Sequence, residues 1–138
     1  MEELSKLDIC SVSNLISTRE VSAVEVTQIA VKRAQELQPS INAFIQLEAD
    51  EALESAEEID NKIKNGERVG PLAGVPLAHK DMFYREGKVT TCGSKIRSTF
   101  KANQTSTALD RLSRAGAIYL GGLNMSEFAV GPIGNNVH

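Results

Sequence analysis

The spacing of apolar residues predicts two helices at the start of the chain. Asp8 can cap a short helix from about Ile9 to Ile16. Ser22 and Glu25 form a capping box, in which the two side chains satisfy the first turn of a second helix. Pro39 is expected to end that helix, whose apolar positions recur every three or four residues: Val26, Ile29, Ala30, Ala34 and Leu37.

A strand and a third helix are predicted next. Alternation of Ile41, Ala43, Ile45 and Leu47 favours a strand with one buried face. An apolar stripe then predicts a helix from about Asp50 to Lys64, which Asn65-Gly66 ends. Its other face is rich in glutamate and aspartate, which we interpret as a solvated surface.

Short apolar runs bounded by glycine and proline predict two strands in the second half, Val75–His79 and Ala117–Leu120. A helix capped within Thr105–Thr107 separates them, and the order strand, helix, strand predicts a right-handed crossover and parallel pairing. Pro76 requires an edge, a bulge or an end position, because proline cannot donate to a strand ladder. Asn124–Phe128 is expected to form a last helical turn that Asn124 caps.

Composition bounds the function classes. The chain has 138 residues, 41% of them hydrophobic, which suits one ordinary soluble domain. A net charge of −3 and 4% aromatic residues disfavour nucleic-acid partners and anionic membranes. No apolar run approaches the roughly 18 residues of a membrane helix, and the acidic N-terminus lacks a signal core, so a cytoplasmic location is expected. Cys10 and Cys92 are too far apart for a metal site, and no metal or cofactor is predicted.

The segment from Gly70 to Asp81 carries the strongest chemical signal. It places Lys80 at the end of a short apolar strand, at the sheet edge where α/β proteins place their chemistry. Partial burial would favour the neutral amine, which can accept a proton near neutral pH. The alternative is an ordinary solvated lysine without a catalytic role.

This segment resembles the lysine-bearing block of the amidase signature family, through Gly70-Pro71-Leu72-Ala73-Gly74-Val75-Pro76 followed by Lys80-Asp81. The resemblance continues through Thr90–Ser94, Ala115–Ile118 and Asn124–Ala129. It implies an α/β fold, the N-terminal part of the family's α/β/α sandwich, with helices packed on a short mixed sheet. It also implies a Ser–Ser–Lys mechanism that hydrolyses or transfers amide nitrogen.

The resemblance identifies Lys80 as the base of that mechanism. It places Met125 and Phe128 beside the active site, where they would bind substrate, although plain core residues share such spacing. Asp81 is interpreted as a brace for its loop, and His79 as a core or surface histidine.

The glycine- and serine-rich stretch that supplies both triad serines does not occur in these 138 residues. We therefore expect a single incomplete domain, helical over about 1–66 and lysine-bearing over about 67–138, from the N-terminal part of a longer enzyme. Its expected partners are a small-molecule amide in that enzyme, and either a second copy or the missing C-terminal part. A general amidase and the A subunit of the glutamyl-tRNA amidotransferase both remain open. The alternative is an inactive truncated fragment that acts at most as an interaction module.

Overall fold

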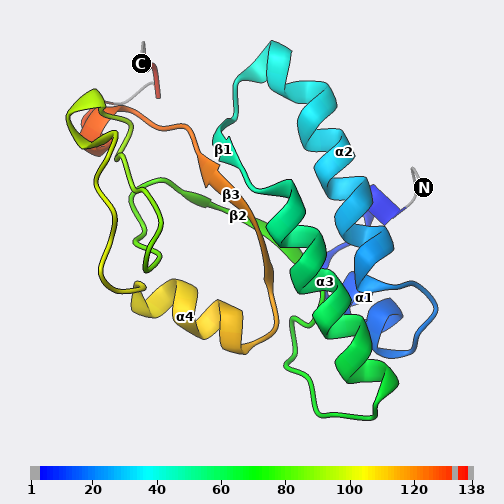
Figure 1. Cartoon of the computed structure of the whole chain (residues 1–138). Coiled ribbons are helices and arrows are strands. Elements are labelled where there is room, and N and C mark those ends of the chain that lie inside the picture. The colour runs from blue at the N-terminus through cyan, green and yellow to red at the C-terminus, as the bar shows by residue number, and fades with distance from the viewer. Residues whose placement is uncertain (1–3, 132–133, 137–138) are drawn as a thin grey trace.

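The computed structural model describes residues 4–131 and 134–136, and its elements follow the predicted order (Figure 1). The helices are α1 (Ile9–Ser17), α2 (Ala23–Ile41), α3 (Ala49–Lys64) and α4 (Thr107–Arg114). The strands are β1 (Phe44–Leu47), β2 (Pro76–Lys80) and β3 (Ile118–Leu123), and short 3-10 turns occur at Leu4–Lys6, Lys95–Arg97 and Glu127–Ala129. Within this described part, no helix has the length and apolarity needed to cross a bilayer.

The predicted helix starts are confirmed by their capping contacts. Asp8 accepts a hydrogen bond from a backbone N–H in the first turn of α1. Both bonds of the capping box are present, since the Ser22 hydroxyl accepts from the Glu25 N–H and Glu25 accepts from the Ser22 N–H. Asp60 on α3 also accepts from the first two N–H groups of α2. This carboxylate therefore fixes the two helices to each other.

The predicted end of α2 is wrong, because Pro39 lies inside the helix and two further residues follow it. A proline near the end of a helix removes only one backbone bond. The helix ends instead at Asn42, whose φ of 45° lies in the left-handed region. The Gln38 carboxamide then bonds both the N–H and the carbonyl of Phe44, which fixes the turn into β1.

Strand β1 is shorter than the alternation predicts. Ile41 belongs to α2, and Ile45 is 42% exposed instead of facing the core. A register shift between Phe44 and Gln46 interrupts the pairing with β3, so the strand does not keep the strict alternation of a regular ladder. The half-buried residues at its two ends, Phe44 and Leu47, pack against the core.

The sheet has the order β1-β3-β2, with β3 in the centre. Strand β2 pairs with β3 in parallel, as the strand–helix–strand order predicts, and β1 pairs with β3 antiparallel. Pro76 is the first residue of β2, a strand with a neighbour on one side only among the described residues. Both positions suit a residue that cannot donate to a ladder.

Helices lie on both sides of β3. Residues of α1, α2 and α3 form the core with Val75, Ile118 and Leu120. Tyr119, which alternates with those two β3 residues, instead donates its hydroxyl to the Leu109 carbonyl in α4. Figure 1 shows the same arrangement, with α4 apart from α1–α3. The chain is thus a mixed α/β fold, as predicted.

The loop before β2 is bonded to the turn before β3. The Leu72 N–H donates to the Ala115 carbonyl at 2.8 Å, and the Gly74 N–H donates to the Gly116 carbonyl at 3.0 Å. At Gly70 a Cβ would lie 2.3 Å from the Ala115 oxygen, so only glycine fits this approach. These contacts align the starts of the two parallel strands, and hence their ends.

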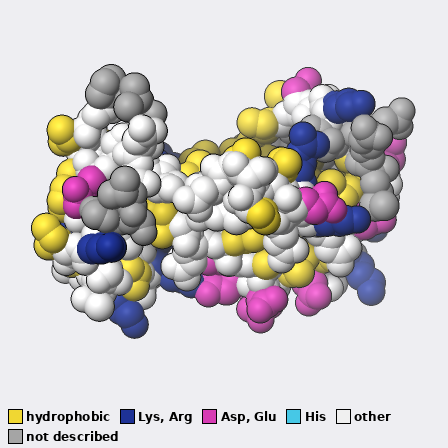
Figure 2. All heavy atoms as spheres, turned by 90° about the horizontal axis from the view of Figure 1, so that it is seen from above, with side chains coloured by type: hydrophobic (Ala, Val, Ile, Leu, Met, Phe, Trp, Pro, Cys, Tyr) yellow, Lys and Arg dark blue, Asp and Glu magenta, His cyan; other side chains and the backbone are white. Residues whose placement is uncertain are grey.

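Apolar side chains remain on the surface of this fold. Figure 2 shows hydrophobic side chains among polar atoms across the face seen from above. The most exposed large ones are Ile96 at 84%, Val130 at 81% and Ile41 at 60%. This area is available for burial against another polypeptide.

Candidate functional site

Lys80 is the last residue of β2 and pairs with Leu123 at the end of β3. It thus lies where the carboxyl ends of the two parallel strands meet, as predicted. Its carbonyl accepts bonds from the N–H groups of Met82 and Phe83, which turns the chain sharply after the strand. The expected partial burial is wrong for this chain, because Lys80 is exposed. None of the described segments covers this end of the sheet.

Asp81 braces the loop beside Lys80. It is 5% exposed, and its carboxylate accepts bonds from both the N–H and the hydroxyl of Thr91. The Thr91 hydroxyl in turn accepts from the Gly93 N–H at 2.9 Å, and the Asp81 carbonyl accepts from the Cys92 N–H. These contacts fix the Thr90–Ser94 loop against the strand that carries Lys80.

The segment after β3 lies against the same loop. The Phe128 N–H donates to the Cys92 carbonyl at 2.8 Å, and the Ser94 hydroxyl donates to the Glu127 carboxylate. The predicted helical turn here is wrong in form, because Phe128 and Ala129 both adopt left-handed φ values, 50° and 60°. Such strained residues persist only where the surroundings determine them.

The two residues predicted to bind substrate lie in this segment but differ in exposure. Met125 is 4% exposed and is buried beside Gly93, whereas Phe128 is 46% exposed. Asn124 accepts a bond from the Met125 N–H, so it orients the start of the segment without capping a helix.

Sequence reasoning missed Asn136. Its Nδ2 atom lies 2.7 Å from the Gly93 carbonyl oxygen and 2.7 Å from the Met125 carbonyl oxygen. A single amide in a run of glycine, proline and asparagine gives no periodic signal, so only the fold reveals this contact.

The comparison with known families decides the relationship. The family model described as Amidase matches residues 25–137, which is most of the chain. The chain belongs to the amidase family. Within it, the chain is the N-terminal portion of the amidase signature fold, as the motifs predict.

Relatives and solved structures of this amidase chain agree. The A subunit of the glutamyl-tRNA(Gln) amidotransferase from Acidothermus cellulolyticus is 42% identical over 131 residues, which cover 95% of this chain and 26% of that protein. Peptide amidase from Stenotrophomonas maltophilia superposes with a TM-score of 0.83 at 31% identity, over 90% of this chain and 26% of that one. Fatty acid amide hydrolase gives a TM-score of 0.86 at 28% identity, over 91% and 22%. The chain therefore spans about a quarter of the length of the relatives it matches.

His79, next to the candidate base of this amidase chain, belongs to a polar cluster away from Lys80. Burial lowers the pKa of its imidazole, and its ring packs edge-on against Tyr119 at 5.8 Å. The Arg85 guanidinium lies 5.0 Å from the centre of the Tyr119 ring and bonds the Glu48 carboxylate. The cluster contacts residues near the middle of β3, so we interpret it as a structural support of the amidase fold.

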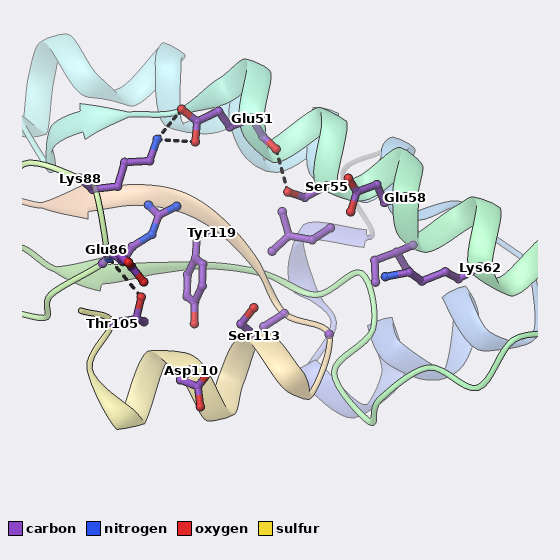
Figure 3. A pocket seen from close by; sticks show the side chains of 15 residues that line it. Glu51, Ser55, Glu58, Lys62, Glu86, Lys88, Thr105, Asp110, Ser113 and Tyr119 are labelled. Atoms are coloured by element: carbon purple, nitrogen blue, oxygen red, sulfur yellow. Dashed lines mark hydrogen bonds and ion pairs between the residues drawn. The ribbon is translucent and has the colours of Figure 1, made fainter. Parts of the chain in front are cut away.

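A cavity of about 440 Å³ opens between α3 and α4, as Figure 3 shows. Charged side chains line it, including Glu51, Lys88 and Asp110, and Lys88 bonds the Glu51 carboxylate. It reaches Ile118 and Tyr119 at the start of β3, whereas Lys80 lies at the far end of the sheet. This cavity is therefore separate from the candidate site.

A cavity of about 250 Å³ lies beside the Thr90–Ser94 loop and β1. Neither Lys80 nor Met125 nor Phe128 is among its lining residues. Within residues 4–131 and 134–136, no three His, Cys, Asp or Glu side chains gather as metal ligands would.

Proposed function

We propose that this chain forms the N-terminal part of an amidase signature enzyme and that Lys80 is the base of its Ser–Ser–Lys triad. The observation that carries the proposal is the meeting of three segments at one sheet edge: Lys80-Asp81, Thr90–Ser94 and Asn124–Phe128. These segments carry the family resemblance, although they are distant in the sequence.

The chemistry requires a neutral Lys80 amine. That amine would accept a proton, through a bridging serine, from the serine that attacks the amide carbonyl. The attack forms an acyl-serine and releases ammonia or an amine, and water or an acceptor amine then cleaves the acyl bond. Both serines would come from a segment outside these 138 residues. That segment would also cover the exposed Lys80 and remove water from it, which favours the neutral amine.

We propose that Met125 and Phe128 line the substrate side of this site. Phe128 offers exposed apolar area next to the Cys92 carbonyl, and Met125 supports it from the buried side. The substrate would then be a small-molecule amide whose acyl part contacts an apolar wall.

A second form of the proposal concerns the reaction. The relative from Acidothermus cellulolyticus and two others, at 45% and 40% identity, all bear the name of the glutamyl-tRNA(Gln) amidotransferase A chain-forming component. This observation favours an enzyme that transfers the amide nitrogen instead of releasing it. Ammonia release from glutamine, alone and in the presence of an acceptor, separates the two reactions.

We also propose that the 138-residue chain has no amidase activity by itself, because loss of a triad nucleophile removes almost all of the catalytic advantage. Its role in isolation would be pairing, either with a second copy or with the polypeptide that supplies the serines. The exposed apolar side chains and the open edge of β2 support this proposal.

The test uses the polypeptide that contains both this chain and the serine-bearing segment. Lys80→Met should lower kcat by about 10²- to 10⁴-fold with a smaller change in KM, since proton transfer is needed mainly in the transition state. Lys101→Met, at an exposed lysine outside the site, is the control. An unchanged kcat in Lys80→Met would remove Lys80 from the mechanism.

A further inference from the structure

Two loops from different parts of the chain meet beside the lysine-bearing strand. One follows β2 and contains Gly93, and the other follows β3 and contains Met125. Asp81 fixes the first loop through Thr91, as described above. The position of the second loop relative to Lys80 therefore depends on how it is bonded to the first.

The Asn136 carboxamide is bonded to both loops at once. Its Nδ2 atom donates to the Gly93 and Met125 carbonyl oxygens, each at 2.7 Å. An amide nitrogen carries two hydrogens, one for each acceptor. Because both partners are carbonyl oxygens, only the NH₂ end of the side chain can face them. Neither a carboxylate nor a hydroxyl offers two donors in this geometry.

Gly93 shows how closely these groups approach. A Cβ at this position would lie 2.6 Å from Asn136 Nδ2 and 2.7 Å from the Met125 carbonyl oxygen. The φ of Gly93 is +68°, which also favours glycine. The loop thus lacks a side chain at the point where the amide of Asn136 enters.

We propose that Asn136 is a positioning residue, which joins the Gly93 loop to the Met125–Phe128 segment and so sets the wall of the site relative to Lys80. The link itself is a property of this chain, whereas its effect on catalysis rests on the proposed function. The order of attachment runs from Asp81, next to Lys80, through the Gly93 loop to Asn136 and Met125.

The first test measures the link without any enzymatic activity. The two carboxamide protons of Asn136 should exchange with water at least about fivefold more slowly than those of Asn135, an exposed neighbour in the same molecule. Nuclear magnetic resonance of the wild-type chain gives both rates. Equal rates for the two side chains would overturn the proposal, whatever happens in the variants.

The second test uses Cys92, which lies in the first loop, as a reporter. In a Cys10→Ser background, Asn136→Asp places a negative oxygen against two carbonyls and removes both donors. The rate of Cys92 labelling by a thiol reagent should rise about 5- to 30-fold, as expected for the loss of one or two hydrogen bonds. Asn135→Asp adds the same charge and should leave the rate unchanged. The same rate in both variants would overturn the proposal.

The third test separates the link from the proposed function, in the polypeptide that contains the serine-bearing segment. Asn136→Asp should lower kcat by about tenfold or more while KM changes by less than about threefold, because misplaced reacting groups mainly cost the transition state. Asn135→Asp should keep the wild-type kcat. If Lys80→Met keeps full activity while Cys92 labelling still responds to Asn136→Asp, the proposed function fails and the link stands. If labelling and kcat both ignore Asn136→Asp, the link fails and the role of Lys80 is untouched.

Discussion

Replacing Glu48 with glutamine tests the polar cluster that joins β1, α3 and the loop after β2. The Glu48 side chain is 7% exposed, and its carboxylate bonds Arg85 and lies 3.3 Å from the Lys88 amine. Burial by itself would raise the pKa of Glu48, but the hydrogen bond and charge of Arg85 and the charge of Lys88 outweigh it and lower the pKa. The carboxylate is therefore charged and paired at neutral pH.

The expected loss follows from how well Arg85 can be rehydrated. Breaking a fully buried ion pair by removing one partner costs about 3–5 kcal/mol. Here Arg85 is 18% exposed and Lys88 is 30% exposed, and both line the cavity between α3 and α4 (Figure 3), where water can reach them. Glutamine also keeps an oxygen that can accept from Arg85. We therefore expect Glu48→Gln to cost about 2 kcal/mol at pH 7, or about 8 °C in Tm for a chain of this size.

The assay is thermal unfolding at one protein concentration, followed by circular dichroism between pH 7 and pH 3. A lowered pKa in the folded state means that the charged carboxylate contributes stability above its usual value of 4.5. The difference between the wild type and Glu48→Gln should shrink as the pH falls below that value. Glu36→Gln, which removes the exposed pair with Lys32, should change Tm by less than about 1 °C. A loss in Glu48→Gln that stays constant down to pH 3 would show that shape, and not charge, explains the effect.

Other expected outcomes concern the sheet, one histidine, a helix cap and assembly. Gly121→Ala should cost about 3 kcal/mol or more in urea unfolding, because its Cβ would lie 2.0 Å from the Gln46 carbonyl at a φ of +137°; Gly87→Ala, with open space around it, should cost only about 1 kcal/mol. His79 has a lowered pKa, so the wild type should lose stability as the pH falls from 6.5 toward about 5, and His79→Gln should lack that slope. Ser22→Ala should destabilise the chain by about 1 kcal/mol in the same assay, whereas Ser55→Ala on α3 should not. Light scattering at micromolar concentration should show association of the isolated chain, and a clean monomer with a cooperative transition would contradict it.

Local signals in the sequence were sufficient to predict most elements of the fold. The caps Asp8 and Ser22 and the parallel pairing of β2 with β3 depend on contacts between near neighbours or on a general rule of handedness. Pro39 misled the prediction because its cost depends on its distance from the helix end, which Asn42 and Gln38 determine. That end is a tertiary feature, and no residue pattern in α2 specifies it.

The candidate site was predictable in its location but not in its geometry. The motif residues predicted that Lys80 and Asp81 end a strand, and the structure places them there. The left-handed Phe128 and the double contact of Asn136 depend on two loops that meet across the sheet, so they have no signature in the order of residues. The exposure of Lys80 was missed for a different reason, since burial at a sheet edge depends on which segments cover it.

The central place of β3 has a consequence for how the chain acquires its shape. Phe44 and Pro76, at the starts of β1 and β2, pair only with the Ile118–Leu123 segment, which leaves the ribosome last among the three strands. Until then the two outer strands have no partner in the sheet, although α2 and α3 can already pack together. Closure of these long loops must wait for synthesis to approach its end. A chain stalled before residue 118 would present two unpaired strands to chaperones, whereas a few more residues would allow the sheet to form.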